Sequence, residues 1–283
     1  MATLRNLQGR PAEAAQLFSQ ALSHAPDDLI VLQNYLVSLV ESKQAQQADR
    51  VLGEYLAKGS RDPNLWRLAG RLYVWQRKTE QAEKAFRKAV DLAPDVALVH
   101  YELGQLYLLE RKLPAAEAAF QAALKKEETN SEAHTALGMV LTAQGRGEAA
   151  DLHYRRAVQL DRYNVVAANN LAASLGERLE LDDALGLALG AHEVAPANPA
   201  IKDTLGWIYY KKHRFEDAHR LLAEASAALP QHPTVRYHHA MTLSRIGKQE
   251  EALAELKTAL ALPGGFPGAD RAAQMIASNK IEE

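Results

Sequence analysis

The chain has 283 residues, of which 47% are hydrophobic and 24% are charged, and its formal net charge is −2. This composition is typical of a soluble, folded chain, and the weak net charge argues against a surface that binds nucleic acid or another polyanion. The sequence contains no cysteine, which excludes disulfides, thiol nucleophiles and thiolate zinc sites.

The N-terminal residues carry no targeting pattern. Residues 1–16 lack the continuous apolar core of a signal peptide, and no stretch of the chain approaches the roughly 18 apolar residues of a membrane-spanning helix. Pro11 to His24 then predicts an amphipathic helix. We expect residues 1–28 to form a truncated helix pair, mainly its second helix. The pattern resembles the cut end of a longer chain, and the alternative is a natural, frayed end.

From Leu29 onward the sequence repeats every 34 residues without insertion or deletion. One column of this frame holds alanine every time, at Ala14, Ala48, Ala82, Ala116, Ala150, Ala184, Ala218 and Ala252. A second column, seven residues later, holds alanine everywhere except at Tyr55. Small residues at fixed spacing mark close contact between helices, and a period of this length is typical of a repeat architecture. The predicted repeats are 29–62, 63–96, 97–130, 131–164, 165–198, 199–232 and 233–266.

The repeat at 63–96 shows how one such unit is built. Apolar residues at spacings of three and four predict a first helix, a polar turn follows at 77–80, and a second apolar face precedes a proline that ends the second helix. The residues of this pattern are Trp66, Ala69, Gly70, Tyr73, Ala82, Ala85, Phe86, Ala89 and Pro94. One helix pair could not bury these faces by itself, but stacked pairs bury a continuous core.

These residues resemble the tetratricopeptide repeat (TPR) family, whose period is also about 34 residues. The resemblance covers nearly the whole chain. It implies an all-α fold, a right-handed superhelical solenoid of antiparallel helix pairs. It also implies that the chain binds a protein or peptide and is not an enzyme.

After the last repeat, the sequence predicts a C-terminal cap. Gly264, Gly265, Pro267 and Gly268 predict a turn, and a short apolar stripe follows it. We expect residues 267–283 to form a capping helix and tail, because a solenoid must cover its last apolar face. The incomplete N-terminal repeat leaves the opposite face exposed, through which a homo-oligomer could form.

In TPR proteins the first helices line a concave groove, and variable positions on them contact the partner. Large apolar side chains that the fold does not require indicate such a binding surface. Trp66 and Tyr73 fit the core pattern, whereas Trp75 and Trp207 lie outside it and either contact a partner or pack on the next helix. The predicted contacts are Arg67, Arg71, Trp75, Tyr101, Gln105, Leu108, Met139, Asn169, Trp207, Tyr210, Tyr237 and Met241. This apolar, weakly charged groove suits an extended segment or an amphipathic helix.

Two better-defined TPR binding modes do not match the sequence. The clamp for the acidic C-terminus of chaperones needs a lysine and an asparagine four residues apart on a first helix, and no repeat has this pair. The asparagine ladder of O-linked N-acetylglucosamine transferases needs asparagine at the sixth position, which only Asn34 and Asn170 provide.

The sequence predicts no catalytic residue, cofactor or metal site. His100 and His134 occupy the same position as Trp66, which indicates packing between helices. The adjacent His238 and His239 face apart on a helix, which is poor geometry for one metal ion.

The last third of the chain has a closer resemblance. Residues 169–172 (NNLA), 203–207 (DTLGW) and 236–237 are similar to bacterial envelope TPR proteins, such as the TPR lipoprotein of exosortase and PEP-CTERM systems. This implies a periplasmic or envelope-associated scaffold in exopolysaccharide export or surface-protein sorting, although the lipid-bearing cysteine of that family is absent. The alternative is a cytoplasmic assembly factor, or a regulatory TPR module of a larger multidomain protein, including an enzyme.

Overall fold

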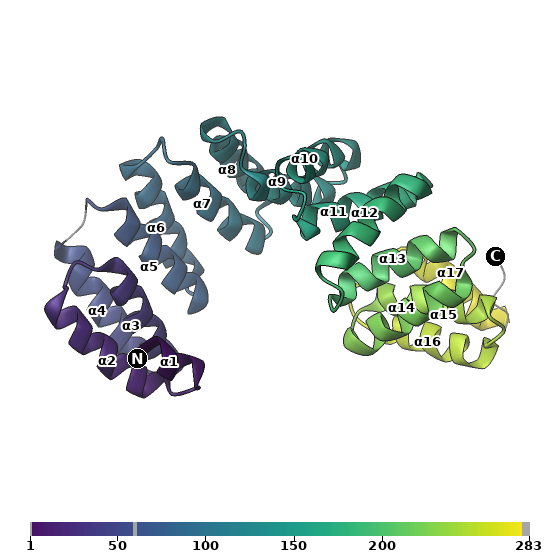
Figure 1. Ribbon diagram of the computed structural model, residues 1–283, viewed down its shortest axis with the longest axis horizontal. Coiled ribbons are helices and arrows are strands. Elements are labelled where there is room, and N and C mark those ends of the chain that lie inside the picture. Colours follow the sequence, from purple (N-terminus) through teal and green to yellow (C-terminus); the bar gives the residue numbers. More distant parts are fainter. Residues whose placement is uncertain (1, 59–60, 279–283) are drawn as a thin grey trace. The chain divides into compact units, whose positions relative to one another are not determined.

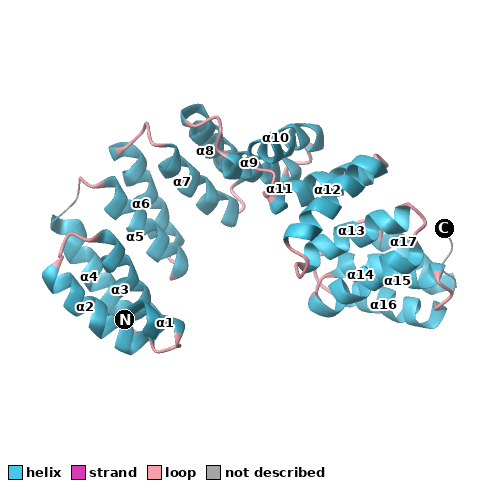
Figure 2. Cartoon of the chain, viewed as in Figure 1, coloured by secondary structure: helices cyan, strands magenta, loops and turns pink. Residues whose placement is uncertain are grey.

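The computed structural model describes residues 2–58 and 61–278, and every regular element among them is a helix (Figure 2). The prediction of an all-α fold is therefore confirmed. The predicted tail at 279–283 lies outside the described residues. The chain divides into two compact units, Met1–Gln144 and Gly145–Glu283, which we call the N-terminal and C-terminal units.

The helices come in pairs, and we call the first helix of each pair helix A and the second helix B (Figure 1). In the N-terminal unit the A helices are α3 (Leu29–Glu41), α5 (Pro63–Trp75), α7 (Ala97–Leu109) and α9 (Ser131–Ala143). The B helices of that unit are α2 (Pro11–His24), α4 (Ala45–Lys58), α6 (Thr79–Leu92) and α8 (Leu113–Lys126). A short helix α1 (Ala2–Leu7) precedes α2 and packs against it.

The C-terminal unit begins with a B helix and continues in the same alternation. Its A helices are α11 (Val165–Glu177), α13 (Pro199–Lys211) and α15 (Pro233–Arg245). Its B helices are α10 (Gly147–Leu160), α12 (Leu181–Val194), α14 (Phe215–Ala228) and α16 (Gln249–Ala261), and α17 (Ala269–Ser278) follows. Within each unit, α3, α5, α7, α11, α13 and α15 each pack on the helix B that follows them.

Most A helices begin at an aspartate or asparagine that caps the first turn. Asp62 Oδ1 accepts a hydrogen bond of 2.8 Å from the backbone N–H of Asn64, and Asn130 Oδ1 accepts one of 2.8 Å from Ala133. Asp28, Asn164 and Asn198 do the same at equivalent positions. These caps satisfy N–H groups that have no partner inside the helix, and so they fix where each helix A starts.

The close approach of helix A to helix B explains the glycine in several repeats. A Cβ atom placed on Gly70 would lie 2.5 Å from the ring of Phe86, and one on Gly104 would lie 2.7 Å from the ring of Phe120. Both rings are buried, with exposed fractions of 3% and 0%. Because Gly70 has no side chain, the ring of Phe86 can pack against the backbone of α5 in the core.

Candidate partner-binding surface

The largest exposed aromatic side chain of α5 is Trp75, which is 44% exposed. Arg71 lies one turn earlier on the same helix and is also exposed. Residues four apart lie on one face of a helix, so Arg71 and Trp75 form a ridge along α5. The core packing of α5 does not use this ridge, because its buried residues are Leu65, Leu68, Ala69, Gly70 and Leu72.

A cavity lies on each side of this ridge. The larger one, about 430 Å³, opens between α5 and α7, and the smaller one, about 190 Å³, opens between α3 and α5. Arg71 and Trp75 line both cavities. The larger cavity is also lined by Val74, Phe86, Glu102, Gln105, Leu106 and Leu109, and the smaller by Gln33, Val37, Leu68 and Leu72. We call the ridge and its two cavities the α5 groove.

The two arginines of α5 differ in their electrostatic surroundings. Arg67 forms a bidentate ion pair with Glu102 of α7, with Nε–Oε2 and Nη2–Oε1 distances of 2.8 and 2.9 Å, and its Nη1 donates to Asn64 Oδ1 at 3.0 Å. The side chains of Arg67 and Glu102 are only 18% and 10% exposed. Arg71, by contrast, makes one long contact of 3.5 Å from Nη1 to Gln33 Oε1 and has no carboxylate partner among the described residues. Arg71 is therefore the uncompensated cation of the α5 groove.

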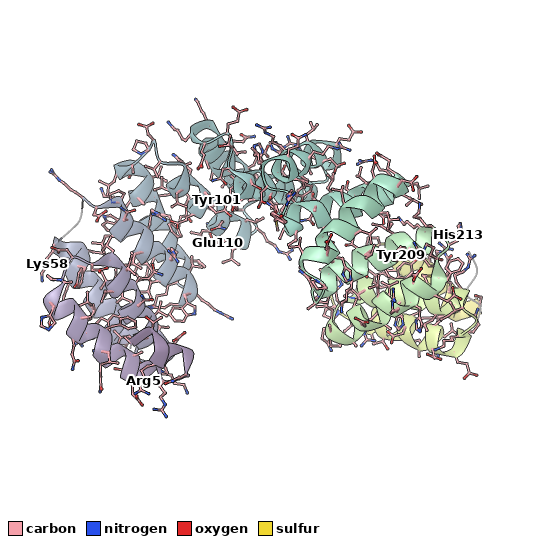
Figure 3. The ribbon with its side chains drawn as sticks, viewed as in Figure 1. Arg5, Lys58, Tyr101, Glu110, Tyr209 and His213 are labelled. Atoms are coloured by element: carbon pink, nitrogen blue, oxygen red, sulfur yellow. The ribbon has the colours of Figure 1, made fainter. Side chains whose placement is uncertain are left out.

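The other predicted contacts of the N-terminal unit lie on α7 and α9. Gln105 is exposed and lines the larger cavity, and its amide donates to the hydroxyl of Tyr101 at 2.9 Å. Tyr101, labelled in Figure 3, packs its ring 5.7 Å from that of Phe120, and burial raises the pKa of its hydroxyl. Leu108 is half-buried and Met139 is 41% exposed, but neither lines a cavity of the α5 groove.

In the C-terminal unit, Trp207 already has contacts on both faces of its indole. Its ring stacks on Tyr210 at a centroid distance of 4.6 Å and on His238 at 4.1 Å. Its Nε1 donates to Glu177 Oε1 at 3.1 Å, and Lys211 Nζ lies 2.8 Å from the same oxygen. Of the two interpretations of Trp207, this geometry favours packing on the next helix A. Asn169, on α11, is half-buried.

Two predicted groove residues are not accessible, and this corrects their assignment. Tyr237 and Met241 are only 6% and 3% exposed. They form a buried cluster with Ala272 and Met275 of α17, next to Trp207 and Tyr210. The sequence frame placed them on the open face of a helix A, but α17 stacks there as the next helix A would.

Sequence reasoning missed Glu102 and Leu106 as groove residues. Leu106 is only 2% exposed and reads as an ordinary core residue, yet it contributes to the larger cavity. Glu102 has a recognisable signal, because it takes the sixth position of its repeat where the preceding repeat has Arg67 at the fifth. Asp203 and His238 show the same arrangement, with Nδ1 of His238 lying 2.9 Å from Asp203 Oδ1.

The described residues offer no group of three or more histidine or carboxylate side chains that could hold a metal ion. His100 and His134 each place Nε2 near a backbone carbonyl of the preceding loop, at 2.8 Å from Pro94 and 3.1 Å from Glu128. Each of these two histidines thus links its own helix A, α7 or α9, to the end of the preceding repeat. Over the described part of the chain, no helix combines the length and apolar character needed to cross a membrane.

Models of the tetratricopeptide repeat match residues 6–72, 67–131, 101–165 and 204–270. These matches cover most of the chain, and the structure has antiparallel helix pairs over the matched residues. The chain therefore belongs to the TPR family. A stretch of 70 residues is 39% identical to a TPR repeat-containing protein of Pseudomonas aeruginosa, and it covers 24% of this chain and 12% of that protein.

Three solved structures illustrate the similarity of fold, and each is less than 25% identical to this chain in sequence. A chain of the APC/C hetero-tetramer Cut9–Hcn1 has a TM-score of 0.72 at 17% identity, over 98% of this chain and 54% of that one. PilF of Pseudomonas aeruginosa has a TM-score of 0.65 at 18% identity, over 77% and 97%. YrrB, described as a TPR protein with an unusual peptide-binding site, has a TM-score of 0.52 at 23% identity, over 65% and 95%. This chain thus spans about half of the Cut9–Hcn1 chain and a small part of the curated relative.

Proposed function

We propose that this chain is an interaction scaffold that holds a peptide, helix or partner domain in the α5 groove. TPR proteins are generally non-catalytic and bind proteins on the surface that their stacked repeats create. The proposal assigns that role to one surface of the N-terminal unit.

The observation that carries the proposal is the pair of cavities beside the exposed indole of Trp75. An apolar side chain buried in such a cavity contributes about 1.5–3 kcal/mol. Tryptophan and arginine are also the residues most often found at the energetic centre of protein interfaces. The C-terminal unit offers less at its equivalent positions, because Tyr237 and Met241 are buried and Trp207 is stacked on both faces.

The experiment compares what the whole chain captures from its own cells before and after Trp75→Ala. Leu152→Ala is the matched control, because Leu152 is an apolar side chain that is 67% exposed on α10, outside the α5 groove. We expect Trp75→Ala to remove at least one partner that the wild type and the control both retain, with helicity unchanged by circular dichroism. An unchanged set of partners would contradict the proposal.

For the pathway, we propose an envelope-associated scaffold in exopolysaccharide export or surface-protein sorting. The support is the resemblance of residues 169–172 and 203–207 to bacterial envelope TPR proteins. A full-length gene that encodes a signal peptide and a lipid-bearing cysteine would favour this role. A gene that lacks both would favour the cytoplasmic assembly factor or the regulatory module of a larger protein. Association through the N-terminal end stays a prediction, which sedimentation of the chain would test.

A further inference from the structure

We propose that the occupant of the α5 groove is an amphipathic helix with two apolar residues seven positions apart and an acidic residue between them. This inference rests on the proposed function and adds the chemistry of the partner. Its two parts, charge and spacing, come from different observations.

The acidic residue of the occupant is inferred from the different ion pairing of Arg67 and Arg71. Glu102 neutralises Arg67 through two short hydrogen bonds, so Arg67 has little attraction left for a partner. Arg71 lines both cavities and has no carboxylate partner among the described residues. An occupant that fills the cavities must pass over the guanidinium of Arg71. A carboxylate at that point would form a charge-assisted hydrogen bond, while a lysine or arginine would be repelled.

The seven-residue spacing of the occupant's two apolar residues is inferred from the cavities on either side of α5. Axes of packed helices are about 8–10 Å apart, so cavities in two successive gaps between A helices are separated by a similar distance. On a bound helix, residues i and i+7 lie on the same face about 10.5 Å apart. Residue i+3 or i+4 lies between them on that face. On an extended strand, residues i and i+2 lie on the same face about 6.7 Å apart, which is shorter than the distance between the cavities. Residues i and i+4, at twice that separation, would reach beyond the second cavity. A helix therefore matches the α5 groove better than an extended segment.

The unequal cavities also give the occupant a direction. The larger one, between α5 and α7, has room for an aromatic side chain, and the smaller one, between α3 and α5, for an aliphatic one. The preferred partner thus carries an aromatic residue, a carboxylate three or four positions away and an aliphatic residue seven positions away, in either chain direction.

The test uses two displayed peptide libraries with the whole chain as bait. The first is an alanine- and glutamine-rich 18-residue helix with five randomised positions on one face. The second presents the same randomised residues in a peptide interrupted by proline and glycine, which cannot form a helix. The baits are the wild type, Arg71→Gln, Arg71→Glu and Trp75→Ala, with Arg50→Gln on the exposed side of α4 as the matched charge control.

We expect the wild type and Arg50→Gln to select helical peptides with the stated pattern, and Arg71→Glu to select lysine or arginine in place of the acid. In a selected peptide, changing the acid to its amide should weaken binding to the wild type about tenfold, which is the effect of one charged hydrogen bond. The same change should have no effect on binding to Arg71→Gln, because the two residues act as a pair.

Two other outcomes separate this inference from the proposed function. Peptides that need Trp75 but show no preference for an acid, or that come from the library unable to form helices, would overturn the inference and leave the proposed function standing. If neither library yields a peptide whose binding is lost in Trp75→Ala, the inference of a helical occupant fails, while the proposed function, which includes a partner domain, is decided by the capture experiment with Trp75→Ala.

Discussion

His219 of α14 and His239 of α15 place two imidazole rings against each other, with centroids 5.4 Å apart and planes inclined by 11°. His239 takes the seventh position of its repeat, where the four preceding repeats have Leu103, Leu137, Leu171 and Leu205. Both ring nitrogens of His239 and Nδ1 of His219 are buried and have no hydrogen-bond partner among the described residues. A polar ring therefore stands where the repeat pattern expects an apolar side chain.

From the surroundings of this pair we predict that the stability of the C-terminal unit depends on pH. Burial lowers the pKa of both histidines below the usual 6.5, and the nearby Lys248 acts in the same direction, while Glu251 and, for His239, Glu255 oppose it. A histidine with a lowered pKa binds its proton more readily in the unfolded chain, so protonation favours unfolding. The free energy of unfolding should be greatest above pH 6.5 and fall as the pH drops from there through the lowered pKa values.

The variant His239→Leu tests this, because it restores the residue of the preceding repeats. We expect it to raise the free energy of unfolding by about 1 kcal/mol at pH 7, since it removes two unsatisfied polar atoms, and by more at pH 5. Denaturant unfolding at both pH values measures the difference, with His24→Gln on the exposed end of α2 as control. A loss of stability between pH 7 and pH 5 that is the same in His239→Leu as in the wild type would contradict the assignment.

At the scale of one helix pair, two glycines of the N-terminal unit should respond in opposite ways to alanine. Gly70→Ala puts a Cβ atom 2.5 Å from the buried ring of Phe86, so α5 and α6 must move apart. We expect a loss of about 1–3 kcal/mol from this overpacking, which outweighs the better helix propensity of alanine. Gly53→Ala on α4 meets no atom within 4 Å and should gain up to about 1 kcal/mol. Thermal unfolding compares the two, and a stabilised Gly70→Ala would show that the core there is looser than the structure indicates.

The elements of the repeat could be predicted from the sequence because each one depends on local chemistry. The spacing of Trp66, Gly70 and Tyr73 defines α5, and the polar turn and proline define the limits of α6. The ion pair of Arg67 with Glu102 was missed because it joins residues 35 positions apart, on successive A helices. The burial of Tyr237 was missed for a related reason, since it depends on how far α17 extends over the last repeat.

At the scale of the whole molecule, the two compact units use equivalent helix positions differently. In the N-terminal unit, the open face of α5 carries an exposed indole, an uncompensated guanidinium and two cavities. In the C-terminal unit, aromatic stacking around Trp207 and the packing of α17 fill the corresponding positions. One fold thus leaves part of its surface open and covers another part with its own side chains.

The most direct test of the central claim places a photo-reactive amino acid at Gln105, which lines the larger cavity of the α5 groove. The matched site is Gln121, an exposed glutamine on helix B of the same repeat. After irradiation in the native cell, we predict a partner crosslinked at position 105, absent at position 121, and lost when Trp75→Ala is added. Crosslinking that is equal at both sites, or that persists without the indole of Trp75, would contradict the assignment of the α5 groove as the partner-binding surface.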